Sequence, residues 1–245
     1  MSPTVEAAGV ELAYRERGKG RAVLLVHGMA DDATAWDEVV DTLHRRARLI
    51  AYDRRGYGAS GAPDPYERTT VAEQAEDAAA LLRALDAAPA LVCGRDLGAL
   101  VCLDLVTRHR GLVRAAVVID PPLYPLVAGA TEALAEERLR LEEALRSGGP
   151  ATAVAEFVGG ARAGEERLAR ATAAPAAFFA DYGGLASWPV SRRGLRLLDI
   201  PLTVLTSAGA PPHAAQAADA LAALVPGARR VHGQPPSDAL ADRLA

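Results

Sequence analysis

The chain has 245 residues, of which 50% are hydrophobic and 24% charged, and its net charge is -4 at pH 7. This length favours a single domain with an insertion. The acidic balance excludes a basic surface for nucleic acid, no apolar run reaches the length of a membrane span, and residues 1–9 lack a signal-peptide pattern. We therefore expect a cytoplasmic protein that binds a small-molecule substrate, no nucleic acid and no membrane, with a homodimer left open.

The sequence predicts neither a metal site nor a cofactor. Its five histidines are scattered, and its two cysteines, Cys93 and Cys102, show no metal-ligand spacing. Cys93 falls in an apolar run and Cys102 in the helical stretch that follows it. We expect both to be small core residues.

Short apolar runs alternate with helical stretches along the chain. The runs, rich in Val, Leu and Ile, predict strands at 23–26, 49–51, 90–93, 115–119 and 202–206. The stretches between them predict helices at 31–43, 71–85, 97–109 and 213–224. Such alternation predicts a mostly parallel sheet with helices on both faces. A ligand site in this architecture lies beyond the carboxyl ends of the strands, where Gly28, Asp53, Asp96 and Asp120 fall.

Residues 121–200 break this alternation. A strongly charged helix is predicted at 130–146, it ends at Ser147-Gly148-Gly149-Pro150, and further helical pieces follow at 151–158 and 165–172. We expect a core of residues 1–120 and 201–245, covered by a helical cap of residues 121–200. Aromatic residues make up only 4% of the chain, yet this stretch contains Tyr124, Phe178, Tyr182 and Trp188. They predict a half-apolar substrate pocket, and the alternative for each one alone is packing of the cap onto the core.

Three motifs follow predicted strands. Strand 23–26 runs into His27-Gly28-Met29, strand 49–51 into the glycine-rich turn at 53–61, and strand 90–93 into Gly94-Arg95-Asp96-Leu97-Gly98. The last motif has the Gly-x-nucleophile-x-Gly pattern between a strand and a helix that is typical of a nucleophile elbow. The alternative for this pentapeptide alone is an ordinary glycine-flanked turn.

In this order and at these spacings, the motifs resemble the α/β-hydrolase superfamily, strongly over residues 10–125 and weakly elsewhere. The resemblance implies an α/β-hydrolase fold with a helical cap inserted after the sixth strand. It also implies that Asp96 is the nucleophile and that the backbone amides of Met29 and Leu97 form the oxyanion hole. His27 is expected beside the substrate, where it braces its loop rather than reacts.

The resemblance places the catalytic histidine just before the final helix, where His232 stands, although the connector from the preceding strand is short. His213 is a second candidate. The loop after strand 202–206 carries no carboxylate, so the acid that orients the histidine is assigned to Asp120, after the sixth strand. The alternative for Asp120 is a turn or helix-capping role before the prolines that follow it.

An aspartate at the elbow predicts a carboxylate that attacks carbon or moves a proton. The first hypothesis is a hydrolase that forms an alkyl-enzyme ester on Asp96, similar to epoxide hydrolases and dehalogenases, with Tyr124 and Tyr182 as paired cap acids. Ala30 and Leu97 depart from the residues that are usual in those subclasses. The alternative is a cofactor-free lyase, isomerase or cyclase in which Asp96 is a general acid or base and His232 does not reach it. A third alternative is a non-catalytic binding protein.

Overall fold

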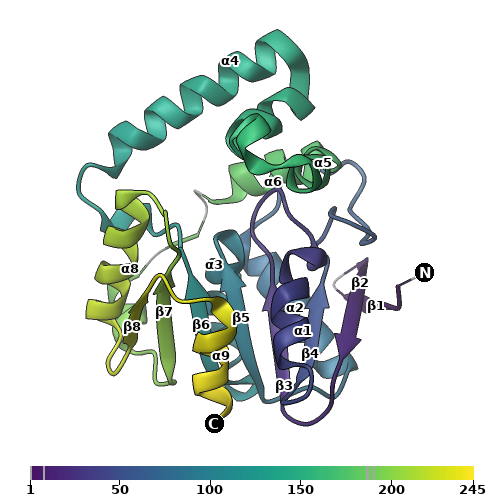
Figure 1. Ribbon diagram of the computed structural model, residues 1–245, viewed down its shortest axis with the longest axis vertical. Helices are drawn as coiled ribbons and strands as arrows, with labels where there is room; N and C mark the ends of the chain where they lie inside the picture. Colours follow the sequence, from purple (N-terminus) through teal and green to yellow (C-terminus); the bar gives the residue numbers. More distant parts are fainter. Residues whose placement is uncertain (1, 8, 186–187, 190) are drawn as a thin grey trace.

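The computed structural model describes residues 2–7, 9–185, 188–189 and 191–245. In this part of the chain, eight strands form one sheet in the order β1-β2-β4-β3-β5-β6-β7-β8 (Figure 1). The strands are β1 (Thr4–Ala7), β2 (Val10–Arg17), β3 (Ala22–Val26), β4 (Arg48–Tyr52), β5 (Ala90–Arg95), β6 (Val113–Ile119), β7 (Leu202–Thr206) and β8 (Arg229–His232). Only the pairings of β2 with β1 and β4 are antiparallel. The predicted mostly parallel sheet is confirmed.

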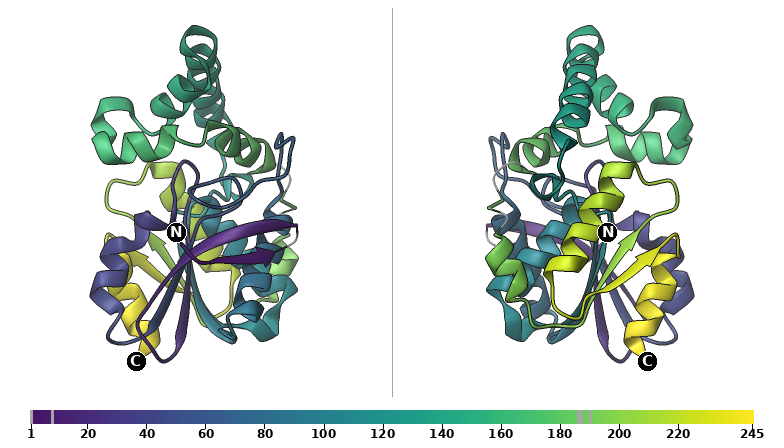
Figure 2. Two further views of the ribbon diagram at one scale, coloured as in Figure 1. Left: turned by 90° about the vertical axis from the view of Figure 1, so that its right-hand side faces the viewer. Right: turned by 90° about the vertical axis from the view of Figure 1, so that its left-hand side faces the viewer.

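Helices cover both faces of the sheet because side chains of the inner strands alternate between two apolar clusters. In β3, Leu24 and Val26 belong to one cluster, and Val23 and Leu25 belong to the other. The first cluster is completed by α2 (Val71–Ala84), α3 (Leu97–Arg108) and α8 (Pro212–Leu224), and the second by α1 (Asp37–Leu43) and α9 (Pro236–Leu244). Figure 2 shows these two layers on either side of the sheet.

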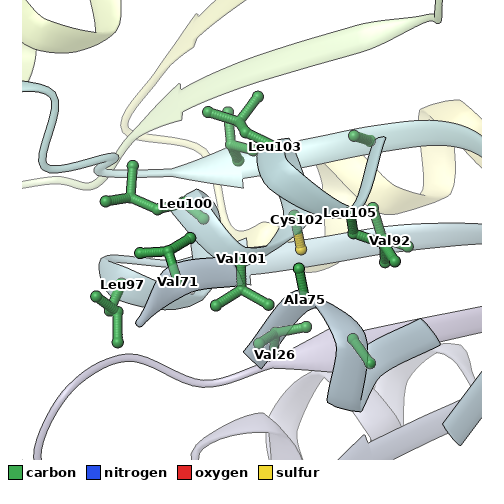
Figure 3. Close-up of a cluster of buried hydrophobic side chains, with 14 of the residues drawn as sticks. Val26, Val71, Ala75, Val92, Leu97, Leu100, Val101, Cys102, Leu103 and Leu105 are labelled. Atoms are coloured by element: carbon green, nitrogen blue, oxygen red, sulfur yellow. The ribbon is translucent and has the colours of Figure 1, made fainter. Parts of the chain in front are cut away.

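Helix α3 is buried along nearly its whole length. Every residue from Leu97 to Val106 is buried, and the neighbouring side chains come from α2, β3 and β5 (Figure 3). A helix that is apolar on all sides belongs in the middle of a core. Its first residue therefore has a fixed position, and so does the turn that leads into it.

Most helices between β6 and β7 lie beyond the carboxyl ends of the strands (Figures 1 and 2). We call this segment the cap. Its elements are η3 (Tyr124–Leu126), α4 (Ala130–Phe157), η4 (Gly160–Ala163), α5 (Glu165–Thr172) and α6 (Pro175–Leu185). The short helix that follows, α7 (Arg192–Arg196), lies outside the cap, beside the sheet, and contacts α8 (Figure 2). The break predicted at 147–150 is a kink inside α4, because Gly149 takes φ +79° and Pro150 follows it.

Two local features differ from the predicted elements. The helix predicted at 31–43 starts as a 3₁₀ turn, η1 (Ala33–Trp36), where the Asp32 carboxylate accepts a hydrogen bond from the Thr34 amide at 2.8 Å. A second 3₁₀ turn, η2 (Arg110–Leu112), leads into β6.

None of the helices in the described ranges is long and apolar enough to cross a membrane.

Candidate active site

Asp96 stands at a sharp turn between β5 and α3, with φ +52° and ψ -124°. This backbone conformation is rare for a residue with a side chain. The flanking glycines permit it, because a Cβ on Gly94 would lie 2.1 Å from the carbonyl oxygen of Gly98. A Cβ on Gly98 would lie 2.3 Å from the carbonyl oxygen of Val26. The turn therefore has the tight packing of a nucleophile elbow, with a half-buried Asp96 as its middle residue.

The Asp96 carboxylate is held by the backbone of the loop after β3. Its Oδ2 accepts a hydrogen bond from the Met29 amide at 2.9 Å, and the Leu97 amide also favours the charged form. Burial is the largest influence on this group and raises the pKa of Asp96 above its ordinary value in spite of those two amides. The Met29 amide, one of the two expected to form the oxyanion hole, thus already binds the carboxylate of Asp96 itself.

His27 lies in the loop that carries Met29, and its ring is buried. Its Nε2 accepts a hydrogen bond from the Arg54 amide at 2.9 Å, so its Nδ1 carries the proton and donates to the Gly28 carbonyl at 2.8 Å. Burial, and then the charge of Arg54, lower the pKa of His27 well below its usual value. A neutral ring with both nitrogens bonded to backbone groups fixes the loop.

Arg54 links this loop to the cap. Its Nε donates to the His27 carbonyl at 2.9 Å, and its Nη2 donates to the Gly28 carbonyl at 2.7 Å. The same Nη2 lies 2.7 Å from Oδ2 of Asp181, a residue of α6. The Arg54 and Asp181 side chains are 1% and 0% exposed, so the pair is fully removed from water.

Tyr124 and Glu137 lie on the cap side of Asp96. Burial, and then the charge of Asp96, raise the pKa of both groups above their ordinary values. The Tyr124 ring also meets the ring of His213 edge to face, with the centroids 5.4 Å apart. One phenol and two carboxyl groups therefore interact in a partly desolvated region.

The structure does not bring His232 to Asp96, contrary to the expected catalytic arrangement. His232 is the last residue of β8, its side chain is 62% exposed, and its Nε2 lies 4.0 Å from Asp219. Only Gly233, Gln234 and Pro235 connect β8 to α9, and the Gly233 amide is bonded to the Thr206 carbonyl at 2.8 Å. This connector is too short to turn the ring toward the elbow.

Asp120 also has a partner other than the one expected. It has φ +47°, and its Oδ1 accepts a hydrogen bond from the Ser207 amide at 3.0 Å. This bond ties the turn after β6 to the loop after β7. No hydrogen bond or ion pair joins Asp120 to His232 within the described ranges of the chain. The turn role proposed as the alternative matches this geometry.

The expected aromatic pocket residues divide into two groups. Phe178 is 0% exposed and packs on Phe157 with ring centroids 4.8 Å apart, so it has no surface to offer a substrate. Trp188 donates from Nε1 to Asp104 of α3 at 2.9 Å. Tyr182 stacks on Phe178 at 5.9 Å but is only half-buried, and burial followed by the charge of Glu137 raises its pKa. Tyr124 and Tyr182 are thus the expected pocket aromatics that interact with the carboxyl groups.

A cavity of about 350 Å³ opens where the cap meets the loops of the core. Asp31 and Arg170 form one wall, with Arg170 Nε 2.7 Å from the Asp31 carboxylate, and Tyr57 and Tyr66 belong to another. Asp96 is not among the lining residues. The cavity is large enough for a small molecule.

Sequence reasoning missed Arg54, Asp181 and Glu137 as parts of this site. Asp181 is the only charged residue in α6, whose sequence is PAAFFADYGGL. A lone carboxylate in an apolar helix indicates a buried, paired charge, since an unpaired one is costly to bury. Glu137 gave no such signal, because it belongs to a helix with charges on every side.

Comparisons with known proteins concern the family and the fold. A family model described as the alpha/beta hydrolase fold matches residues 21–142. The "Uncharacterized hydrolase YraK" of Bacillus subtilis is 34% identical over 126 residues, which are 51% of this chain and 46% of that protein. A haloalkane dehalogenase of Agrobacterium fabrum is 31% identical over 119 residues, 49% of this chain and 38% of that one. A bifunctional epoxide hydrolase 2 of Sus scrofa is 30% identical over 118 residues, 48% of this chain and 21% of that one.

These matches span less than half the length of the curated relatives. Among solved structures, an esterase from Thermogutta terrifontis with malate bound superimposes with a TM-score of 0.76 at 25% identity. That comparison covers 99% of this chain and 96% of the esterase chain. The similarity of fold therefore extends over the cap and the carboxyl-terminal strands.

Proposed function

Because the chain belongs to the α/β-hydrolase superfamily, we propose that it is a hydrolase whose nucleophile is Asp96. Its substrate in this proposal is a small apolar molecule with an epoxide or a carbon–halogen bond. The observation that carries the proposal is the 2.9 Å hydrogen bond from the Met29 amide to Oδ2 of Asp96. In an esterase that amide donates a hydrogen bond to the carbonyl oxygen of the substrate. Here it already donates to the carboxylate of Asp96.

The proposed reaction has two steps. Oδ1 of Asp96 attacks the electrophilic carbon, and the carbon–halogen bond or one carbon–oxygen bond of the epoxide breaks to leave an ester on Asp96. Water then attacks Cγ of Asp96, negative charge develops on Oδ2, and collapse of this intermediate releases the alcohol. The amides of Met29 and Leu97 favour negative charge on the carboxylate before the reaction starts, so they need no rearrangement in the second step.

Proton transfers in this scheme fall to groups of the cap. Tyr124 and Glu137 interact with the charge of Asp96, whereas His232 is exposed beside Asp219. Tyr124 is therefore proposed to protonate the oxygen of an opened epoxide. Ionised Glu137 is proposed to accept a proton from the attacking water.

Mass spectrometry after turnover in H₂¹⁸O tests the covalent step. Repeated cycles place oxygen from water in the carboxylate of the nucleophile, so the peptide that contains Asp96 is expected to gain mass with a substrate from a panel of epoxides and haloalkanes. The Asp96→Asn variant is the control and is expected to form no ester. Product formation by the wild-type protein without label in Asp96 would rule out the covalent mechanism.

Two observations favour a second candidate, a cofactor-free lyase, isomerase or cyclase in which Asp96 moves a proton. The exposure of His232 removes the usual base for hydrolysis of an ester, and burial raises the pKa of Asp96 toward the range useful for proton transfer. This candidate predicts turnover that depends on Asp96, with no mass change in the protein and no water oxygen in the product.

A further inference from the structure

We propose that Asp181 is a positioning residue, which couples the seating of the cap on the core to the amide geometry that holds Asp96. The expected effect on the rate of ester formation rests on the proposed role of Asp96 as the nucleophile. The structural coupling between α6 and the loop after β3 is independent of that role.

Asp181 lies on α6 but reaches into the core. Its side chain is 0% exposed and accepts three hydrogen bonds, each at 2.7 Å. The donors are Nη2 of Arg54 and the hydroxyl of Tyr57 at Oδ2, and Nε2 of Gln74 at Oδ1. All three donors belong to the core. Within this hydrogen-bond network, the Asp181 carboxylate is the group that comes from the cap.

Two of these donors continue to the loop that carries Met29. Arg54 donates to the carbonyl oxygens of His27 and Gly28 at 2.9 and 2.7 Å. The hydroxyl of Tyr57 lies 3.5 Å from the Ala30 amide, which donates to it. Met29 stands between these anchored residues, and its amide is the one that donates to Asp96. Ala30 has φ +52°, a conformation that persists only where surrounding contacts hold it.

Removal of Asp181 from the core would leave Arg54 as a buried charge without its counter-charge. A buried guanidinium without a carboxylate partner reorients toward water or admits water around it. Either response withdraws the donors from the carbonyl oxygens of His27 and Gly28. The peptide plane that carries the Met29 amide then loses its bond from Arg54 and keeps only the bond from His27 to the Gly28 carbonyl. Displacement of the cap therefore also loosens the aim of the Met29 amide at Asp96.

A neighbouring ion pair provides a matched control. Arg55 follows Arg54 in the chain and binds Asp77 of α2, with Nε–Oδ2 at 2.7 Å and Nη2–Oδ1 at 2.8 Å. Both side chains are at most 4% exposed. Both residues belong to the core, and their ion pair includes no group of the cap or of the loop 27–30. Asp181→Asn and Asp77→Asn therefore remove the same kind of charge from two buried pairs, only one of which connects the cap to that loop.

Hydrogen exchange measured by mass spectrometry on the wild-type protein and both variants, without substrate, tests the coupling. Peptides covering 27–34 are expected to exchange about tenfold faster in Asp181→Asn and at the wild-type rate in Asp77→Asn. Tyr57→Phe keeps the ion pair and removes one link to Ala30. Tyr57→Phe is expected to accelerate hydrogen exchange in the same peptides by a smaller factor. If Asp181→Asn does not fold, the exchange rates of Tyr57→Phe test the coupling instead.

Unchanged exchange at 27–34 in the folded Asp181 or Tyr57 variant would overturn the coupling, and so would equal acceleration in Asp77→Asn. A kinetic measurement separates this proposal from the proposed function. With an epoxide or haloalkane that labels wild-type Asp96, Asp181→Asn is expected to slow ester formation at saturating substrate by about a hundredfold, with little change in KM. If no compound labels the wild-type protein, the proposed function fails while the exchange experiment still decides the role of Asp181.

Discussion

Replacement of Gly98 by alanine probes how closely the elbow must approach the end of β3. A Cβ at this position would lie 2.3 Å from the carbonyl oxygen of Val26 and 2.5 Å from that of His27. Ordinary contact begins at 3.4 Å, so α3 and the end of β3 must separate by about 1 Å. Neither can move easily, because the strand lies in the centre of the sheet and the helix is buried on all sides.

The expected cost follows from two opposing effects. Overfilling a packed core lowers the free energy of unfolding by about 1–3 kcal/mol. Alanine in place of glycine inside a helix restores up to about 1 kcal/mol. We therefore expect Gly98→Ala to lower the free energy of unfolding by about 1–2 kcal/mol, which for a chain of this size lowers Tm by about 2–8 °C. Because a displacement of about 1 Å also separates Asp96 from the Met29 amide, ester formation should slow by about a hundredfold.

Urea denaturation and the rate of Asp96 labelling measure these two effects. Gly111→Ala is the control, because Gly111 is exposed and a Cβ there meets nothing within 4 Å. The control is expected to stay within about 0.5 kcal/mol of the wild-type stability and to label at the same rate. If Gly98→Ala behaves like the control in both measurements, the close approach of α3 to β3 is not what fixes the elbow.

Three further predictions concern charge. Because the pKa of Asp96 is raised in the folded protein, the free energy of unfolding falls as pH rises and the carboxyl group ionises. Asp96→Asn cannot ionise, so it should be more stable than wild type at neutral pH. The difference should vanish below about pH 4, where Asp96 is protonated in the folded and the unfolded state. Urea denaturation across pH checks this, and a margin independent of pH would contradict it. His232→Ala should change the free energy of unfolding by less than about 0.5 kcal/mol and leave the lifetime of any Asp96 ester unchanged, since the ring is exposed beside Asp219. If intact-protein mass spectrometry shows a longer-lived Asp96 ester in His232→Ala, His232 takes part in hydrolysis of the ester. Glu137→Gln removes the carboxylate proposed to accept a proton from the attacking water, so hydrolysis of an Asp96 ester should slow while its formation keeps the wild-type rate. An unchanged ester lifetime by intact-protein mass spectrometry would contradict this role.

The predicted strands were confirmed where strands are buried on both faces. β3 and β7 have every residue buried, so they read as continuous apolar runs. The sequence did not indicate β1, which is the edge strand, or its neighbour β2, because both have exposed residues among the buried ones. In β2, Val10 and Leu12 are buried while Glu11 between them is exposed. A short, charged, alternating segment of this kind resembles a loop until its partner strand is known.

For the candidate site, the elbow was predictable because its geometry is local. The position of Asp96 follows from the strand, the turn and the helix that meet within a few residues. The position of His232 depends instead on the register of β8, where Val231 is buried and its neighbour must therefore face away. Asp181 depends on how α6 docks, which no nearby residue specifies. The apolar sequence of α6 indicates that Asp181 has a partner, but nothing local identifies that partner as Arg54, 127 residues away.

That long separation also has a consequence for how the protein acquires its structure. Arg54 is made early and lies in the centre of the core, but its counter-charge emerges from the ribosome 127 residues later. Until then the sheet must either leave Arg54 in water or bury an unpaired charge, which is strongly unfavourable. We therefore expect the first half of the chain to stay incompletely packed during synthesis, and a chain shortened by loss of the cap helices not to reach the native core.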